Sequence, residues 1–161
     1  MGSEEVNDDV PLSAGQIRTR ILQDNAVVRA HLVKVKALVP ECGVGAPETF
    51  ELLVSAALAL VDEMRGHLAL EDRMLVPALE AADAWGPVRR ERVEMEHAKV
   101  REELDMLADR LRTTRGFDRD LALTVEALIN ELFAEIAAEE REALDPDTLR
   151  DDVVAIGQTD G

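Results

Sequence analysis

The chain has 161 residues, enough for one domain or for one domain with a tail, and its 34 acidic and 18 basic residues give a formal net charge of −16. Such an acidic protein repels phosphate backbones and anionic lipid head groups, which argues against nucleic acids and membrane surfaces as partners. Hydrophobic residues make up 47% of the chain, too many for a disordered acidic polypeptide, whereas aromatic residues, at 2%, are too few for a sheet-rich protein. We therefore expect an all-α domain.

The first predicted helix begins at a capping box. Ser13 is followed three residues later by Gln16, the spacing at which each side chain can bond the backbone N–H of the other residue. The helix should end at about Val39, because Pro40 follows. The polar residues before it, 1–12, are expected to be flexible.

Glycine- and proline-containing breaks divide the rest of the chain into three more long helices. These are expected over residues 48–82, 88–113 and 118–144. Pro77 should mark a kink or a frayed end in the second of them. Four long helices with short connections predict an up-down-up-down four-helix bundle over residues 13–146. A C-terminal segment, 147–161, should hold a short helix at 148–156 and a polar tail.

Cys42 is the only cysteine, so the chain can form neither an internal disulfide nor a cysteine-based zinc site. No apolar run is long enough to span a membrane, and the first residues are acidic rather than basic and then apolar. These features predict a cytoplasmic location without a signal peptide. The sequence leaves the oligomeric state open.

Each predicted helix has an apolar stripe at alternating three- and four-residue spacing, and each stripe is interrupted by polar residues. The interruptions in the second, third and fourth helices are His67 and Glu71, His97, and Glu135 and Glu139. The first helix can be read in two phases, which place either Asn25 or the pair Asp24 and His31 on the stripe. Counting from the turns puts the interruptions within about two turns of one another, so they should form one layer across the bundle.

Such a layer predicts a metal site. Buried carboxylates that face one another cannot all stay ionised unless a positive charge lies between them. No lysine or arginine falls on these positions, so the charge must come from protons or metal cations. Imidazoles and carboxylates at i, i+4 spacing on one helix face are donors suited to iron or manganese.

Two segments resemble motifs of the hemerythrin-like HHE cation-binding family. Residues 67–77, HLALEDRMLVP, resemble the family's H-x-x-x-E-[ED]-x-x-L-x-P signature on the second helix. Glu96-His97 resembles the E-H pair of the third helix. The resemblance covers residues 14–146 and implies the four-helix fold of that family.

Two other segments resemble the family with one substitution each. Residues 135–140, EIAAEE, resemble the fourth-helix H-I-x-x-E-E, with Glu135 where histidine is usual. Residues 24–29, DNAVVR, resemble the first-helix D-H-x-x-I-R, with Asn25 where histidine is usual. Two of the four expected histidines are therefore replaced.

The resemblance implies two non-haem iron ions, with a mixed manganese–iron pair as the alternative. The implied ligands are the bridging Glu71 and Glu139, the capping His67 and His97, and the flanking Glu135 and Asn25. His67 and Asn25 would lie at one ion, and His97 and Glu135 at the other.

This ligand set resembles that of ferritin-like di-iron oxidases and oxygenases more than that of a reversible oxygen carrier. Anionic oxygen donors favour the higher oxidation states of iron, and a weak or absent Asn25 ligand leaves a position open. We therefore expect activation of O2, peroxide or another small molecule. The alternatives are a non-catalytic di-iron sensor or store for O2, NO or iron, and a metal-free bundle that acts as an interaction module.

The register of the last helix stays open in the sequence. Aligning the last helix on the proline that follows it would put Ile136 at the ligand position and make Glu140 the bridge. The apolar phase of the same helix favours Glu135 and Glu139 instead.

The histidines also need carboxylates to orient them, since a hydrogen bond to the second ring nitrogen fixes an imidazole ligand. Glu63 and Glu94 lie one turn before His67 and His97 and are candidates for this role. The alternative is that both face solvent.

Overall fold

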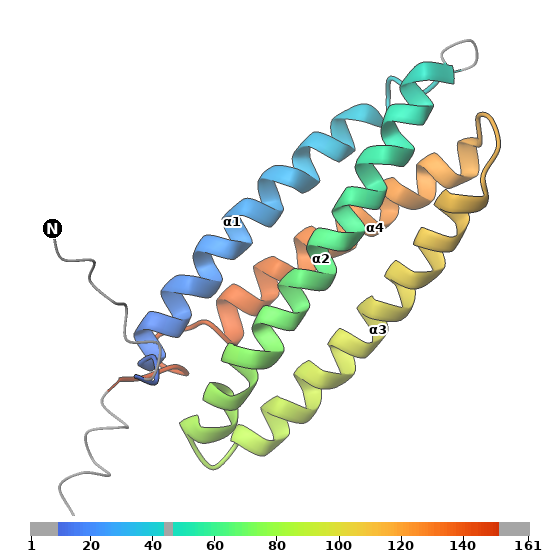
Figure 1. Ribbon diagram of the computed structural model, residues 1–161. Helices are drawn as coiled ribbons and strands as arrows, with labels where there is room; N and C mark the ends of the chain where they lie inside the picture. Colours follow the sequence, from blue (N-terminus) through green and yellow to red (C-terminus); the bar gives the residue numbers. More distant parts are fainter. Residues whose placement is uncertain (1–9, 44–46, 152–161) are drawn as a thin grey trace, which may run out of the picture.

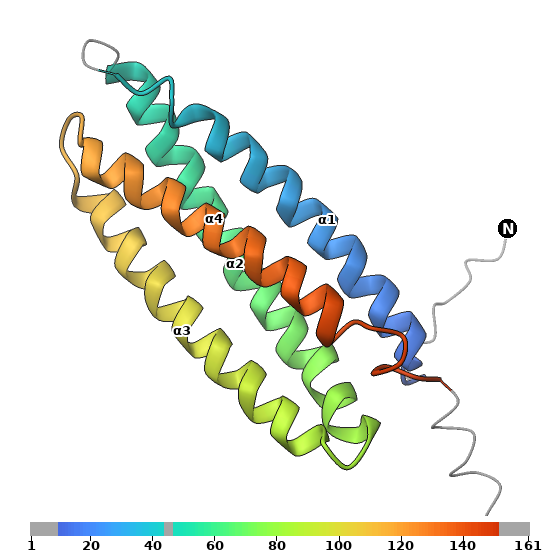
Figure 2. The same cartoon turned by 180° about the vertical axis from the view of Figure 1, so that it is seen from behind.

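The computed structural model describes residues 10–43 and 47–151, which form an up-down-up-down bundle of four α-helices (Figure 1). The helices are α1 (Ala14–Leu38), α2 (Pro47–Ala82), α3 (Gly86–Thr113) and α4 (Arg119–Glu142). The α1–α2 and α3–α4 connections lie at one end of the bundle, and the α2–α3 turn lies at the other, near the start of α1 and the end of α4 (Figure 2). The predicted all-α architecture is confirmed, and the described residues contain no strand.

The helix ends follow local capping chemistry. The predicted capping box is present, because Ser13 Oγ accepts a hydrogen bond from Gln16 N at 3.1 Å and Gln16 Oε1 accepts one from Ser13 N at 2.8 Å. Asp118 caps α4 by accepting a hydrogen bond from Leu121 N at 3.0 Å. Pro77 lies inside α2, and the helix continues past this proline to Ala82.

Two of the connections require glycine. A Cβ atom at Gly86 would lie 2.0 Å from the carbonyl oxygen of Glu80, so the α2–α3 turn can close only around glycine. Gly116, in the α3–α4 connection, has a φ of 77°, in the left-handed region that side chains disfavour. These two glycines let long helices reverse direction within a few residues.

Two apolar clusters fill the bundle, and a polar layer separates them along the helices. The larger cluster lies toward the α1–α2 connection, where Phe50 packs edge-on against Phe117 with ring centroids 5.5 Å apart. The smaller cluster lies toward the α2–α3 turn and includes Ile21 and Leu75. The buried polar residues between them are Asn25, His67, Glu71 and His97. The interruptions in the apolar stripes thus lie at one level of the bundle.

Burial decides between the two phases considered for the first helix. Asn25 is fully buried in α1, together with Ile21 and Val28, whereas Asp24 and His31 are only partly buried. α1 therefore packs in the first of the two phases. Asp24 lies at the edge of the buried face, next to the polar layer.

The chain after α4 returns to the start of α1. Residues 143–151 form turns and bends; Asp147 N donates to Asp145 Oδ1 at 2.7 Å, which favours a tight turn over continued helix. Arg18 Nε donates to the carbonyl oxygen of Leu144 at 2.7 Å, and Gly15 N donates to Asp151 Oδ1 at 2.8 Å. Most of the short helix predicted at 148–156 and most of the flexible segment predicted at the N-terminus lie outside the described residues.

None of the helices in the described part of the chain has the length and apolar content needed to cross a lipid bilayer.

Candidate metal centre

The polar layer surrounds a small cavity inside the bundle. Its volume is about 50 Å³, and five of the residues that line it are His67 and Glu71 of α2, His97 of α3, and Glu135 and Glu139 of α4. A cavity of this size holds water molecules or ions but no organic molecule of ordinary size. Five of the six residues predicted for the site thus line one cavity.

Glu71 lies between the two histidines. His67 Nε2 is 2.6 Å from Glu71 Oε1, and His97 Nε2 is 2.8 Å from Glu71 Oε2. His67 and Glu71 lie one turn apart on the same face of α2, which brings their side chains together. Glu139 completes the closest group, since one ligand atom from each of His67, Glu71 and Glu139 lies within 4.8 Å of the other two.

An aspartate holds the other ring nitrogen of each histidine. Asp24 Oδ2 contacts His67 Nδ1, and Asp72 Oδ1 lies 2.7 Å from His97 Nδ1. Because an ionised carboxylate can only accept a hydrogen bond, each Nδ1 carries a proton and each Nε2 turns toward Glu71. The contact of Arg101 with Asp72 favours the ionised form and, with that of His97, lowers the pKa of Asp72 despite its partial burial.

Glu63 and Glu94, the two candidates for this orienting role, have other partners. Glu63 contacts His31 on α1, and Glu94 accepts a hydrogen bond from Arg90 at 2.8 Å. A glutamate one turn away on the same helix is therefore not what fixes either imidazole. The second nitrogen of each ring faces a neighbouring helix, so the carboxylate comes from that helix.

Three buried oxygen atoms of the layer lack a hydrogen-bond partner among the described residues: Glu71 Oε1, Glu139 Oε1 and Asn25 Oδ1. Leaving a buried polar atom unsatisfied costs about 1–3 kcal/mol. Glu71 Oε1 faces the nitrogen of His67 that its tautomer leaves without a proton, and two such acceptors repel each other at 2.6 Å unless a proton or a metal cation lies between them. The donor set therefore fits a cation.

Without a metal, protons would supply this positive charge. Burial opposes ionisation of Glu71, but the contacts with His67 and His97 lower its pKa to about 2. Burial, followed by the negative charge of Glu71, raises the pKa of Glu139 to about 10. Burial also disfavours charge on the two histidines, yet their contacts with Glu71 prevail and the pKa of each is raised. The layer thus binds protons at neutral pH that a metal cation would replace.

The family model described as the hemerythrin HHE cation-binding domain matches residues 17–145, a span that includes every residue of the layer. The chain belongs to the hemerythrin HHE family. No curated protein and no solved structure matches the chain. Membership implies a cation-binding domain, and the layer of histidines and glutamates is where the described residues offer buried donors for a cation.

The rotation of α4 brings Glu139, and not Glu140, into this hemerythrin-family site. Arg29 donates to both oxygens of Glu140, at 2.6 and 2.8 Å, and Asn25 Nδ2 donates to Glu140 Oε1 at 3.2 Å. Ile136 also lines the cavity, but its side chain offers no donor atom and packs into the larger apolar cluster. The preferred register of the last helix is therefore the one present in the structure.

The remaining predicted residues lie at the margin of the closest group. Glu135 lines the cavity but is half-buried, and burial, followed by the charge of Glu103, raises its pKa. Asn25 keeps its amide oxygen unpartnered while its nitrogen binds Glu140. His31 contacts Glu63 and lies outside the cavity lining.

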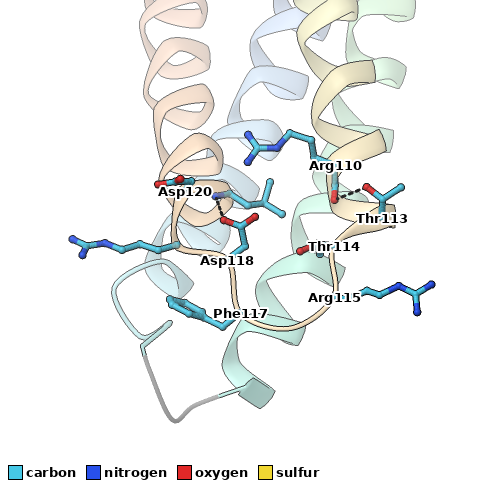
Figure 3. Close-up of a pocket in the computed structure, with 9 residues that line it drawn as sticks. Arg110, Thr113, Thr114, Arg115, Phe117, Asp118 and Asp120 are labelled. Carbon is cyan, nitrogen blue, oxygen red and sulfur yellow. Dashed lines mark hydrogen bonds between the residues drawn. The ribbon is translucent and has the colours of Figure 1, made fainter.

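A separate cavity of about 640 Å³ lies at the α3–α4 connection, away from the metal centre (Figure 3). There Asp118 caps α4, and the hydroxyl group of Thr113 donates to carbonyl oxygens of its own helix, at 2.8 Å to Asp109 and at 3.4 Å to Arg110. These polar groups serve to end one helix and begin the next.

Proposed function

We propose that this hemerythrin-family protein holds two non-haem iron ions in the polar layer and activates O2 or peroxide in an oxidase- or oxygenase-type reaction. One observation carries the proposal. A buried carboxylate oxygen of Glu71 faces the Nε2 atom of His67 at 2.6 Å without a hydrogen-bond partner among the described residues. Such an arrangement is stable only with a positive charge between the two atoms.

Each residue of the layer would bind one or both of the two ions. Glu71 and Glu139 would bind between the ions, because Glu71 already has one oxygen toward each histidine. His67 and His97 would each bind one ion through Nε2, with Nδ1 held by an aspartate. Glu135 would join the ion of His97. Bound irons supply the redox chemistry for reducing O2 or peroxide, and a mixed manganese–iron pair is the alternative content.

Two features favour oxidation chemistry over reversible oxygen carriage. Glu135 and Asn25 stand where the family usually has histidine, so the donor set is rich in anionic oxygen, which favours the higher oxidation states of iron. The amide nitrogen of Asn25 is engaged by Glu140, and only its oxygen remains as a weak donor. An ion held by His67 would therefore have a weaker donor than histidine at this position.

A second candidate function is a non-catalytic di-iron sensor or store for O2, NO or iron. The small size of the cavity, about 50 Å³, favours it, because such a space admits a diatomic molecule or peroxide but no organic substrate. Catalysis on an organic substrate therefore needs a second space that adjoins the cavity.

The decisive experiment is anaerobic loading with iron(II), followed by metal analysis and exposure to air. We expect about two irons per chain and a ferric charge-transfer band that develops on exposure to O2. A chain that binds no metal would contradict the proposal and support a metal-free interaction module. Reversible oxygen uptake without net oxidation would support the sensor or store instead.

A further inference from the structure

A cleft between α3 and α4 adjoins the metal centre. Its volume is about 360 Å³, within the range of about 300–1,000 Å³ typical of small-molecule sites. Three of its lining residues, Glu96, Glu135 and Glu139, also line the small central cavity. A molecule in the cleft is therefore separated from the metal centre only by the side chains that the two spaces share.

The inner wall of the cleft is apolar. Its apolar lining residues are Leu79 of α2, Val93 of α3, Ala138 of α4 and Ala143 at the C-cap of α4. The short alanine side chains leave this space open between the two helices. An aliphatic or aromatic body would bury apolar surface here.

The α3 side of the cleft is basic. Arg89, Arg92 and Lys99 line it, although the chain as a whole has a net charge of −16. Arg89 is the most closely paired of the three, at 2.7 Å from Asp83, and Lys99 lies 3.6 Å from Glu103. Arg92 is 66% exposed, and its partners Glu96 and Glu142 lie 3.2 and 3.5 Å away. Exposed ion pairs of this kind contribute little to stability, so the guanidinium group can turn to another anion at low cost.

The acidic residues of the cleft do not cancel this charge once a metal is bound. Glu135 and Glu139 would then be metal ligands, which leaves Glu96 and Glu142, both partners of Arg92, as the remaining carboxylates of the cleft. Arg92 precedes His97 by five residues, about 7.5 Å along α3. A short molecule could thus place its anionic group at Arg92 and its far end beside the metal centre.

We propose that the α3–α4 cleft is the substrate site and takes a short organic carboxylate with an apolar body, bound at Arg92 with its far end toward Glu135. This inference rests on the proposed function of the metal centre. Arg92 would select the substrate and position it, and Val93 and Ala138 would contact its apolar part.

Binding can be tested without iron, which separates this inference from the proposed function. Octanoate is titrated into the full-length protein loaded with zinc(II), a redox-inactive stand-in for iron, with backbone amide NMR shifts as the readout. We expect saturable shifts near Val93, Ala138 and Ala143, and about tenfold weaker binding for Arg92→Gln, the loss of one charged hydrogen-bonding partner. Arg112→Gln, which removes an exposed arginine at the far end of α3, should bind octanoate like the unmodified protein.

Octylammonium and octanamide serve as matched ligands of opposite and zero charge, and Ala138→Leu as a variant that fills the cleft. We expect both ligands to bind at least about tenfold more weakly than octanoate, and Ala138→Leu, with its helix content checked by circular dichroism, to weaken octanoate binding. Equal binding of octylammonium would overturn the proposal. Shifts confined to a separate pocket of about 400 Å³, lined by Met74, Ala78 and Leu149, would overturn it as well. If iron binds but octanoate does not, the inference fails while the proposed function stands.

Discussion

The two histidines of the metal centre lie in different surroundings. His67 is enclosed, with Glu71 and Glu139 close to it and Asp24 behind its ring. His97 lies on the side where Glu135 and its neighbours also line the α3–α4 cleft. From this difference we expect the His67 side to hold a cation more tightly and the His97 side to give access to the site from the cleft.

Glu71 belongs to both sides, so its replacement tests the whole centre. We expect Glu71→Gln to weaken metal binding by more than about 100-fold, because even partners outside the ligand shell are worth about 10–100-fold. A cobalt(II) titration against a chelator measures the affinity. Glu63→Gln is the matched control, since this glutamate of the same helix contacts His31 instead. Unchanged affinity in Glu71→Gln would contradict the site.

The two aspartates separate the two sides. Asp24→Asn should weaken the tighter phase of metal binding, and Asp72→Asn the looser phase, each by about 10–100-fold. The reason is that each carboxylate fixes the ring of one histidine and makes its Nε2 a stronger donor. Asp62→Asn, at an exposed residue of α2, is the control. Equal loss in both phases from either variant would show that the two sides are not distinct.

The pH dependence of metal uptake tests the protons that the layer holds. The pKa of Glu139 is raised to about 10 and that of His67 is raised as well, so a cation must displace protons at neutral pH. We expect metal affinity to rise about tenfold per pH unit for each proton released, between about pH 6 and pH 8. An indicator dye in weakly buffered solution measures the release. A cation that binds without proton release would contradict the assignment of Glu139.

The smallest expected effect is on the stability of the metal-free protein. The native state keeps the proton of Glu139 up to about pH 10, whereas the unfolded chain loses it near its ordinary pKa of 4.5. Native protein therefore binds more protons between these values, and its stability falls as pH rises through this window. Glu139→Gln replaces this buried acid with a neutral amide that needs no proton. It should therefore raise the free energy of unfolding at pH 8 by about 1–3 kcal/mol.

Urea denaturation at pH 4 and pH 8 measures that change. Glu140→Gln is the informative neighbour, because it loses the ion pair with Arg29 and should destabilise the protein instead. If Glu139→Gln were destabilising at both pH values, Glu139 would be ionised in the metal-free fold.

Much of the fold could be predicted because helix periodicity alone determines which side chains are buried. The stripes of the second, third and fourth helices, and one of the two phases of the first, match the buried faces of the structure. The same periodicity selected His67, Glu71 and His97, which interrupt those faces. The cleft escaped prediction, because alanines such as Ala138 and Ala143 give no distinct signal in a helix rich in alanine.

The partners of the histidines could not be read from periodicity. Spacing along one helix pointed to Glu63 and Glu94, but the orienting groups are Asp24 and Asp72, each on a helix adjacent to its histidine. Sequence spacing fixes which residues share a face of one helix. It does not fix how far a neighbouring helix is rotated, and that rotation decides which carboxylate meets an imidazole.

The fork between Arg29 and Glu140 joins α1 to α4 outside the metal centre, in the same rotation that the apolar face of α4 favours. Glu139 thus faces the site before any ion is present. Loading would then be an exchange of hydrogen ions for metal ions at a preformed template, with no refolding step. Its speed would depend on how fast ions reach the interior, and the apo and loaded proteins would share one backbone.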